Sequence, residues 1–188
     1  MHLDAVFNTF PQLETERLIL RKLRADDAGS LFTILGDQEV TEYYDDDAFT
    51  DVSQARDQIQ AWAEGFGARR CVRWGIVQQG GNEVVGTCGY YGFHRLHKRA
   101  GIGYELAQSC WRQGIMTEAV SAIIDFCFER IGLNRIEAVV MLGNEGSFKL
   151  LGGLRFHQEG VLRAYERWGS KGFVDLMMFS LLRRDVEG

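Results

Sequence analysis

The segment Ser109–Ala119 is the part of the sequence whose residue types and spacing best suit chemistry. Its letters, SCWRQGIMTEA, place Gly114 just before a stretch with helical apolar spacing. The first N–H groups of a helix lack partners within the helix, and the helix dipole favours negative charge there. A phosphate or pyrophosphate is therefore a candidate ligand, although a tight turn without any ligand has the same local pattern.

Other phosphate-binding and metal-binding patterns are absent from the sequence. Neither GxGxxG nor GxxxxGK[ST] occurs, and Gly101-Ile102-Gly103 falls inside an expected strand. The four cysteines form no CxxC pair and have no histidine at ligand spacing, so we expect no metal and small, buried, reduced thiols; they are Cys71, Cys88, Cys110 and Cys127.

Composition bounds the protein class. The 188 residues are 46% hydrophobic and 25% charged, which predicts one domain spanning 1–188 with its core at about 13–183. A net charge of −5 argues against nucleic acid as the main partner. No basic leader and no run of about 18 apolar residues is present, so the sequence predicts a soluble cytoplasmic protein without a membrane partner.

The elements that must position the Gly114 segment follow from periodicity and turn signals. A strand before Gly114, a helix after it and another strand predict a right-handed crossover with parallel neighbouring strands, whose carboxyl ends open a crevice. The expected strands are Leu13–Leu23, Trp74–Val77, Val84–Phe93, Ala100–Leu106, Arg135–Val140, Phe156–Leu162 and Phe173–Leu182. The expected helices follow Arg24–Asp27 and Thr50–Ser53, and cover Thr117–Ile131 and Asn144–Leu154.

Four groups of residues together resemble the GNAT superfamily of N-acetyltransferases, in detail its RimJ/RimL-like branch of ribosomal-protein alanine N-acetyltransferases. The resemblance implies the GNAT acyl-CoA N-acyltransferase fold, an α/β (α+β) mixed sheet, mostly antiparallel, with one splayed parallel strand pair and flanking helices. The groups are Leu13–Arg21; Ile102–Leu106 with Trp111, Gly114 and Thr117–Ala119; Gly132–Ala138; and Asn144, Ser147, Phe156 and Glu159–Arg163.

The resemblance implies that acetyl-CoA is the cosubstrate and implies which residues bind it. Backbone amides of the loop would hold the pyrophosphate, the end of strand Ala100–Leu106 would pair with pantetheine, and an N–H near Leu106 or Ala107 would polarise the acyl oxygen. Trp111 and the bulky Met116 depart from the superfamily's general loop pattern. The implied cofactor residues are Leu106, Ala107, Trp111, Arg112, Gln113, Gly114, Ile115, Met116, Thr117, Asn144 and Ser147. Asn144 can equally cap the short helix after it.

The resemblance also implies the proton-transfer groups. Many GNAT enzymes carry a tyrosine seven residues after the asparagine, but Leu151 stands there, and Ser147 matches the serine proposed as the acid in RimL-like enzymes. Glu166 matches the proposed base, and Glu105 is its rival. His157 and Tyr165 are reserve candidates.

The acceptor is expected to be a primary amine, foremost the α-amine of a protein N-terminus. Deprotonating an α-amine at pH 7 costs about 1.4 kcal/mol, against about 4.6 kcal/mol for a lysine amine. The alternatives are an enzyme for polyamines, amino acids or antibiotics, and a non-catalytic CoA-binding module. The resemblance also allows a homodimer.

Two charged segments have open interpretations. Glu39, Glu42 and Asp45–Asp47 either attract a cationic acceptor or form a solvated loop, and we expect the solvated loop. The basic loop His94–Arg99 either binds nucleic acid, which the net acidity disfavours, or faces the ribosome or the 3′-phosphate of CoA.

Overall fold

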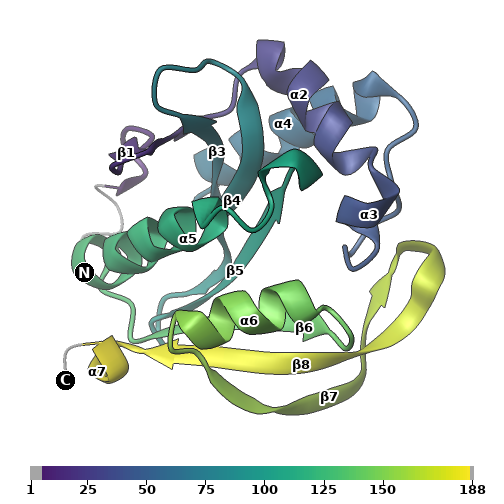
Figure 1. Cartoon of the computed structure of the whole chain (residues 1–188). Helices are drawn as coiled ribbons and strands as arrows, with labels where there is room; N and C mark the ends of the chain where they lie inside the picture. Colours follow the sequence, from purple (N-terminus) through teal and green to yellow (C-terminus); the bar gives the residue numbers. More distant parts are fainter. Residues whose placement is uncertain (1–5, 187–188) are drawn as a thin grey trace.

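The computed structural model describes residues 6–186, which contain an eight-stranded sheet in the order β1-β2-β3-β4-β5-β6-β8-β7 (Figure 1). All neighbouring strands are antiparallel except β5 and β6, which are parallel as predicted. The strands are β1 Leu13–Glu14, β2 Leu18–Lys22, β3 Cys71–Gln78, β4 Val84–His94, β5 Arg99–Leu106, β6 Arg135–Met141, β7 His157–Trp168 and β8 Gly172–Leu182.

Helices connect the strands and pack on the sheet. None of the helices in the described residues is long and apolar enough to cross a membrane. They are α2 Ala28–Leu35, α3 Gln38–Thr41, α4 Val52–Gly67, α5 Ile115–Asp125 with a π-helical continuation Phe126–Ile131, α6 Glu145–Gly153 and α7 Arg183–Val186, with 3-10 turns at Ala25–Asp27, Gln108–Cys110 and Gly169–Lys171.

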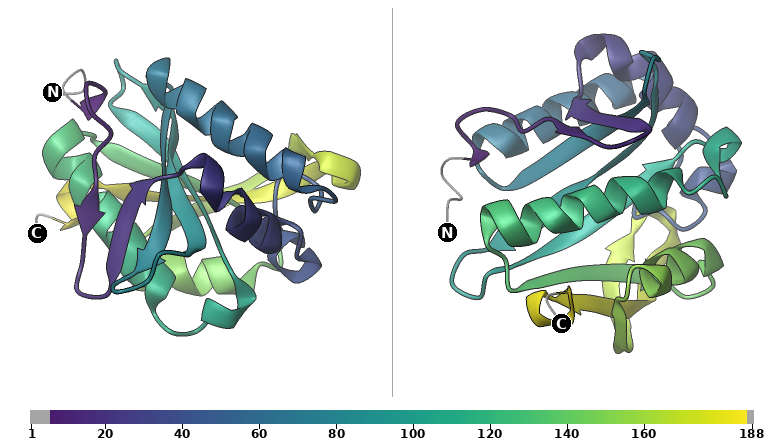
Figure 2. Two further views of the ribbon diagram at one scale, coloured as in Figure 1. Left: turned by 90° about the horizontal axis from the view of Figure 1, so that it is seen from above. Right: turned by 60° about the vertical axis from the view of Figure 1, so that its left-hand side comes forward.

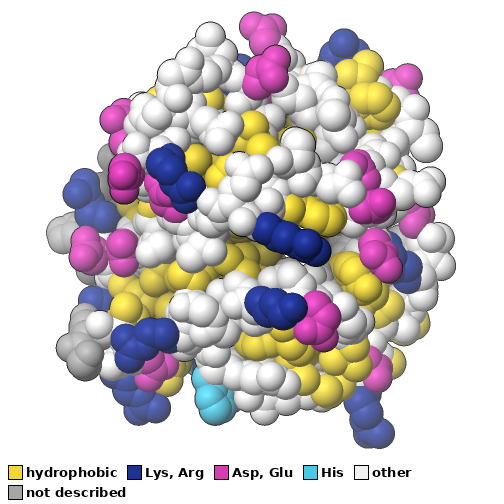
Figure 3. Space-filling view, in the orientation of Figure 1, with side chains coloured by type: hydrophobic (Ala, Val, Ile, Leu, Met, Phe, Trp, Pro, Cys, Tyr) yellow, Lys and Arg dark blue, Asp and Glu magenta, His cyan; other side chains and the backbone are white. Residues whose placement is uncertain are grey.

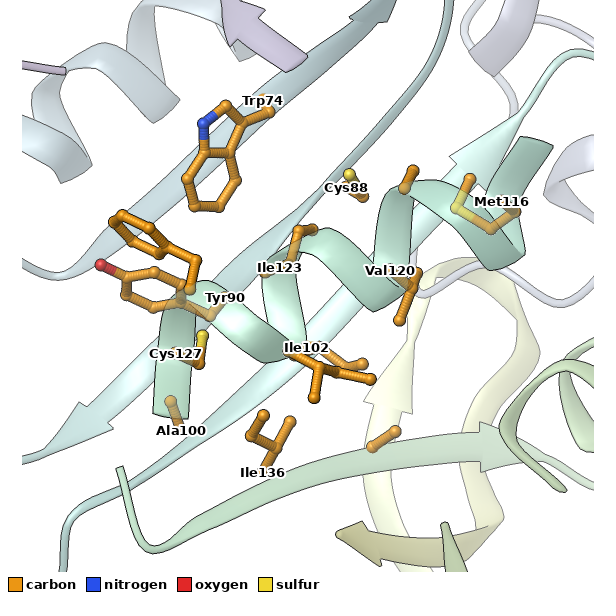
Figure 4. Packing of buried hydrophobic residues seen from close by; sticks show 14 of the residues in the cluster. Trp74, Cys88, Tyr90, Ala100, Ile102, Met116, Val120, Ile123, Cys127 and Ile136 are labelled. Carbon is orange, nitrogen blue, oxygen red and sulfur yellow. The ribbon is translucent and has the colours of Figure 1, made fainter. Parts of the chain in front are cut away.

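Two apolar clusters hold the helices against the sheet. Figure 2 shows the arrangement of these helices from two further sides. The larger cluster joins α5 and α6 to strands β2 to β6 and β8, and Figure 4 shows α5 residues Val120 and Ile123 beside Ile102 of the sheet. The smaller cluster joins α2 and α4 to residues of β3 and β4. Because the sheet residues alternate between faces, separate sets of side chains serve the two clusters.

The parallel pair β5 and β6 is joined over only three residue pairs and then separates. Arg99 to Gly101 pair with Arg135 to Glu137, whereas β5 continues to Leu106 and β6 to Met141. Charged groups bridge the joined end: Glu137 accepts from Arg99 Nη1 at 2.6 Å and from Arg135 Nε at 2.7 Å. Beyond this end each strand presents backbone groups to a gap, so the predicted crevice is present.

Four local predictions differ from the structure. The expected strand Leu13–Leu23 is divided between β1 and β2 because Glu118 of α5 accepts hydrogen bonds from the turn between them, at 2.5 Å from Thr15 Oγ1 and 2.9 Å from Arg17 N. Asp27 precedes α2 but does not cap it with its side chain, since its carboxylate pairs with Arg21 at 2.8 Å.

The helix predicted at Thr117–Ile131 begins two residues earlier and changes to π-helix after Asp125. Gly132, in the left-handed region at φ 79°, ends it as expected. Cys88, Cys110 and Cys127 are buried as predicted, but Cys71 is only half-buried.

Candidate functional site

A cavity of about 450 Å³ occupies the open side of the β5–β6 separation. Figure 3 shows apolar side chains gathered across this face, over the region between α5 and α6 in Figure 1. The cavity is lined by residues of the 43–62 segment, the middle of β3 to β6, the start of α6 and the end of β7. Among them are Tyr44, Asp45, Asp46, Trp62, Arg73, Tyr91, Gly103, Tyr104, Val139, Asn144, Ser147, Glu166 and Trp168.

The N-terminus of α5 is a turn that leaves backbone amides without a side-chain cap. Gly114 is its N-cap residue at φ 75°, a conformation that glycine adopts without strain, and no side chain caps the helix. The first backbone bond of the helix joins Glu118 N to Gly114 O at 3.0 Å. The N–H groups of Ile115, Met116 and Thr117 precede that bond and have no partner within the helix.

Neighbouring side chains hold the turn without covering those amides. Arg17 Nη1 donates to Gln113 O at 3.0 Å and its Nε to Glu118 Oε2 at 2.6 Å. Met116, whose bulk departs from the family pattern, is only 8% exposed because its side chain packs in the core beside α5 (Figure 4). Its size therefore does not obstruct the approach of a phosphate.

The end of β5 exposes backbone groups to the gap. Ala107 N donates to Val85 O at 2.8 Å, and antiparallel alternation then turns the N–H of Leu106 away from β4. Trp111 Nε1 donates to Leu106 O at 2.8 Å, which fixes the loop that follows. Of the two amides expected to polarise an acyl oxygen, the Ala107 N–H already donates to Val85 O. The Leu106 N–H is therefore the one that can donate to an acyl oxygen.

The start of α6 brings Asn144 and Ser147 to the other side of the gap. Asn144 Oδ1 accepts from Ser147 N at 3.0 Å, so the predicted cap is present. The side-chain amide nitrogen of Asn144 remains available as a donor to a ligand. Ser147 is half-buried and lines the cavity together with Tyr104.

Glu105 lies beneath the cavity in a buried ion pair. Its side chain is 2% exposed, and its carboxylate accepts hydrogen bonds from Arg73 and from the Thr87 hydroxyl, which itself accepts from Arg73 Nε at 2.6 Å. Burial raises the pKa of Glu105, and the Arg73 charge and the Thr87 hydroxyl oppose that shift. With its oxygens engaged, Glu105 is placed to orient Arg73 rather than to take a proton from a ligand.

Glu166 reaches the cavity from β7, next to an irregularity in that strand. Residues 163–165 bulge out between the pairs Leu162–Leu176 and Glu166–Val174, and Asp175 Oδ1 stabilises the bulge by accepting from Ala164 N at 2.7 Å. Such bulges bend a strand and redirect side chains. Trp168 Nε1 donates to Glu166 Oε2 at 3.1 Å, so one oxygen is oriented while the carboxylate stays exposed.

The acidic segment Asp45–Asp47 is an exposed loop, as expected, and it also borders the cavity. Asp45 and Asp46 line the cavity, and partial burial raises the pKa of Asp45, with the neighbouring charges of Asp46 and Glu166 adding to the rise. Asp47 Oδ1 accepts from Ser170 Oγ at 2.6 Å, and Lys171 Nζ donates to Tyr44 O at 3.1 Å. These bonds join the segment to the turn between β7 and β8, which bends toward α3 in Figure 1.

The basic loop lies far from the Gly114 turn. The basic loop connects β4 to the first residue of β5, whereas the Gly114 turn comes after the last residue of β5. The eight residues of β5 span roughly 25 Å at the usual rise of a strand. His94 and His97 stack there with ring centres 4.1 Å apart. The interpretation of this loop as a site for the 3′-phosphate of CoA is therefore disfavoured.

Sequence reasoning missed Arg73 and assigned no role to Tyr104, Trp62 or Tyr91, all of which line the cavity. Strand alternation was the available signal for the buried pair, because Arg73, Thr87 and Glu105 fall on the same face of three adjacent strands. No signal in the sequence links Tyr104 to Ser147, since 43 residues and a helix separate them.

Comparisons with known proteins identify the class. Residues 17–157 match the family described as "Acetyltransferase (GNAT) domain", and this chain belongs to that family. It is 45% identical over 177 residues to an uncharacterized N-acetyltransferase, p20, of Bacillus licheniformis, covering 94% of this chain and 98% of that protein.

Solved structures have the same fold. A putative ribosomal-protein-serine acetyltransferase from Vibrio cholerae superposes with a TM-score of 0.81 at 25% identity, covering 92% of this chain and 98% of that one. Mycobacterium smegmatis RimJ, solved in complex with CoA-disulfide, superposes with a TM-score of 0.80 at 24% identity, covering 91% and 84%.

The chain is thus an N-acetyltransferase that uses acetyl-CoA, and its own residues fit that cosubstrate. The uncapped amides after Gly114 suit a pyrophosphate, and the unpaired edge of β5 suits the amides of pantetheine. Among residues 6–186, no group of histidine, cysteine or acidic side chains is arranged to hold a metal ion.

Replacing Gly114 by tryptophan is expected to abolish acetyl-CoA binding. A side chain at φ 75° is strained, and a Cβ there already lies 3.3 Å from Arg17 Nη2, so the added ring displaces the turn or covers its amides. Isothermal titration calorimetry measures the loss. Gly152→Trp, on an open face of α6, is the matched control and keeps wild-type affinity; full binding by Gly114→Trp contradicts the phosphate assignment.

Replacing Glu105 by alanine is expected to lower the free energy of unfolding by about 3–5 kcal/mol, because it leaves the Arg73 charge buried without its partner. Glu105→Gln, which keeps the hydrogen bonds to Arg73 and Thr87 partly intact, loses less. Urea denaturation followed by circular dichroism measures both. The exposed Glu83→Ala serves as control and changes stability by less than about 0.5 kcal/mol; an equal effect of Glu105→Ala contradicts the buried-pair account.

Proposed function

We propose that this enzyme transfers the acetyl group of acetyl-CoA to the α-amine of a protein N-terminus. The observation that carries the proposal is that Ser147 and Glu166, a hydroxyl and a carboxylate from different elements, line one cavity at the β5–β6 gap. The similarity to the Vibrio cholerae protein, a putative ribosomal-protein-serine acetyltransferase, supports a protein acceptor.

Glu166 is the group we assign to the acceptor amine. An ammonium must lose a proton before its nitrogen can attack the thioester, and an α-amine needs only a modest base. Glu166 is exposed to the cavity and oriented by Trp168, whereas Glu105 is engaged by Arg73 and Thr87. Glu166 therefore acts as the base, directly or through one water, and Glu105 keeps Arg73 in place.

Ser147 and Leu106 N–H act on the acetyl-CoA side of the cavity. The Leu106 amide points toward the gap, where it stabilises negative charge developing on the acyl oxygen. Ser147 provides the hydrogen for the departing sulfur. Holding both substrates in one cavity removes the need for a covalent enzyme intermediate.

A compact cationic amine is the second candidate acceptor, favoured by the composition of the acceptor wall. Asp45 and Asp46 bring two carboxylates to the side of the cavity that Glu166 occupies. Trp62 and Tyr91 add aromatic rings, which attract cations. Such a wall suits a polyamine as well as the protonated N-terminus of a peptide.

Measuring CoA release with two acceptor pools distinguishes the candidates. One pool contains short peptides that begin with Ala or Ser, and the other contains polyamines, amino acids and aminoglycosides. Peptide-dependent release, with mass spectrometry locating the acetyl group on the α-amine, is the expected result. Release with the small amines alone replaces the protein acceptor by the second candidate, and binding of acetyl-CoA without release in either pool favours a CoA-binding module.

Glu166→Gln is expected to lower kcat about 100-fold, within the usual effect of a general base, with little change in acetyl-CoA affinity. Ser147→Ala likewise lowers kcat and preserves affinity, because the Asn144 cap uses the backbone of Ser147. Steady-state kinetics and calorimetry measure the two quantities. The exposed Glu129→Gln on the far turn of the α5 continuation is the control; wild-type turnover in either test variant removes that residue from the mechanism.

A further inference from the structure

Tyr104 has a buried hydroxyl that the fold does not use. The residue lies on β5, one position before Glu105, and lines the cavity. Its hydroxyl oxygen is buried and has no partner of hydrogen-bond geometry among the described residues. Leaving such a group unpaired lowers the stability of the fold by about 1–3 kcal/mol. The hydroxyl is therefore not explained by stability, and a role in function would explain it.

Ser147 lines the same cavity as Tyr104. The serine lies across the gap at the start of α6 and lowers the pKa of Tyr104, although burial outweighs this effect and raises that pKa to about 12. Tyr104 is therefore protonated throughout the physiological pH range and is a donor. The Tyr104 hydroxyl makes no hydrogen bond to Ser147 in the structure, and catalytic hydrogen bonds often form only when the substrate is bound.

Ser147 alone is a poor proton donor for a departing thiolate. An aliphatic hydroxyl is a far weaker acid than a phenol, even one whose pKa is raised to about 12 as that of Tyr104 is, and thiols have pKa values near 8.5. If Ser147 gives its proton to sulfur, it needs another at once. Leu151, at the position where many family members have a tyrosine, cannot supply one.

We infer that Tyr104 supplies this proton, acting through Ser147 as a positioning and relay residue for the proposed acetyl transfer, on which this inference rests. When the C–S bond breaks, the electron pair goes to sulfur and the Ser147 hydroxyl proton forms the S–H bond. The Tyr104 proton restores the Ser147 hydroxyl, and the phenolate takes a proton from solvent. The proton that the amine loses leaves through Glu166.

Tyr104→Phe tests the inference, because it removes only the hydroxyl. The expected result is a kcat at least tenfold lower, an unchanged KM for acetyl-CoA and an unfolding free energy equal to or above that of the wild type. Tyr90→Phe is the matched control. Tyr90 also borders the cavity and has a buried hydroxyl without a partner among the described residues, but its ring packs in the core against Trp74 and the inference gives its hydroxyl no role. It keeps wild-type kcat.

Two further readouts separate a relay from a structural role. In a Ser147→Ala background, Tyr104→Phe is expected to have little additional effect on kcat, since both residues act on one proton. In addition, ultraviolet titration of bound CoA measures the pKa of its thiol. That pKa is expected to rise in Tyr104→Phe, because the variant weakens hydrogen bonding to the thiolate.

The outcomes are decisive. Unimpaired kcat in Tyr104→Phe, an equal loss in Tyr90→Phe, full additivity with Ser147→Ala or an unshifted thiol pKa overturns the inference while leaving acetyl transfer intact. Failure of the wild-type protein to acetylate any amine overturns the proposed function itself, and the thiol titration still tests the effect of Tyr104, through Ser147, on the bound thiol.

Discussion

The separation of β5 from β6 is the constraint on which the rest of the structure depends. Three residue pairs, reinforced by Glu137 between Arg99 and Arg135, fix where the strands part. A longer pairing would close the cavity and cover the amides at the end of β5. A shorter one would leave α5 without a continuous sheet to pack on, since its apolar residues contact strands on both sides of the gap.

The two sides of the cavity are built by different physical means. The side proposed for the cofactor is mainly backbone: uncapped amides after Gly114, an amide at Leu106 and a short helix that follows Asn144. The acceptor side consists of side chains from the 43–62 segment and from β7, joined by the bonds of Asp47 and Lys171 to distant residues. Backbone amides remain when a side chain is substituted, so binding through them tolerates sequence change. On the acceptor side, a substitution changes the charged or aromatic group that faces the cavity.

The sequence predicted the crossover, the parallel pair and the Gly114 turn because these depend on local periodicity and on the conformational freedom of one glycine. It did not predict the break between β1 and β2, which depends on Glu118, a residue about 100 positions away. The buried pair of Arg73 and Glu105, the role of Asp45 in the cavity wall and the approach of Tyr104 to Ser147 are likewise products of tertiary packing. Local patterns contain no information on such contacts.

The unpaired strand edges at the gap also have a consequence for the behaviour of the protein in solution. Exposed edges are templates for pairing with other chains, and proteins usually shield them. Under the proposed binding mode the pantetheine arm of the cosubstrate covers this edge, and a ligand that binds only the folded chain also stabilises it. At a ligand concentration of 100 times the dissociation constant, such linkage adds about 2.7 kcal/mol to the folded state.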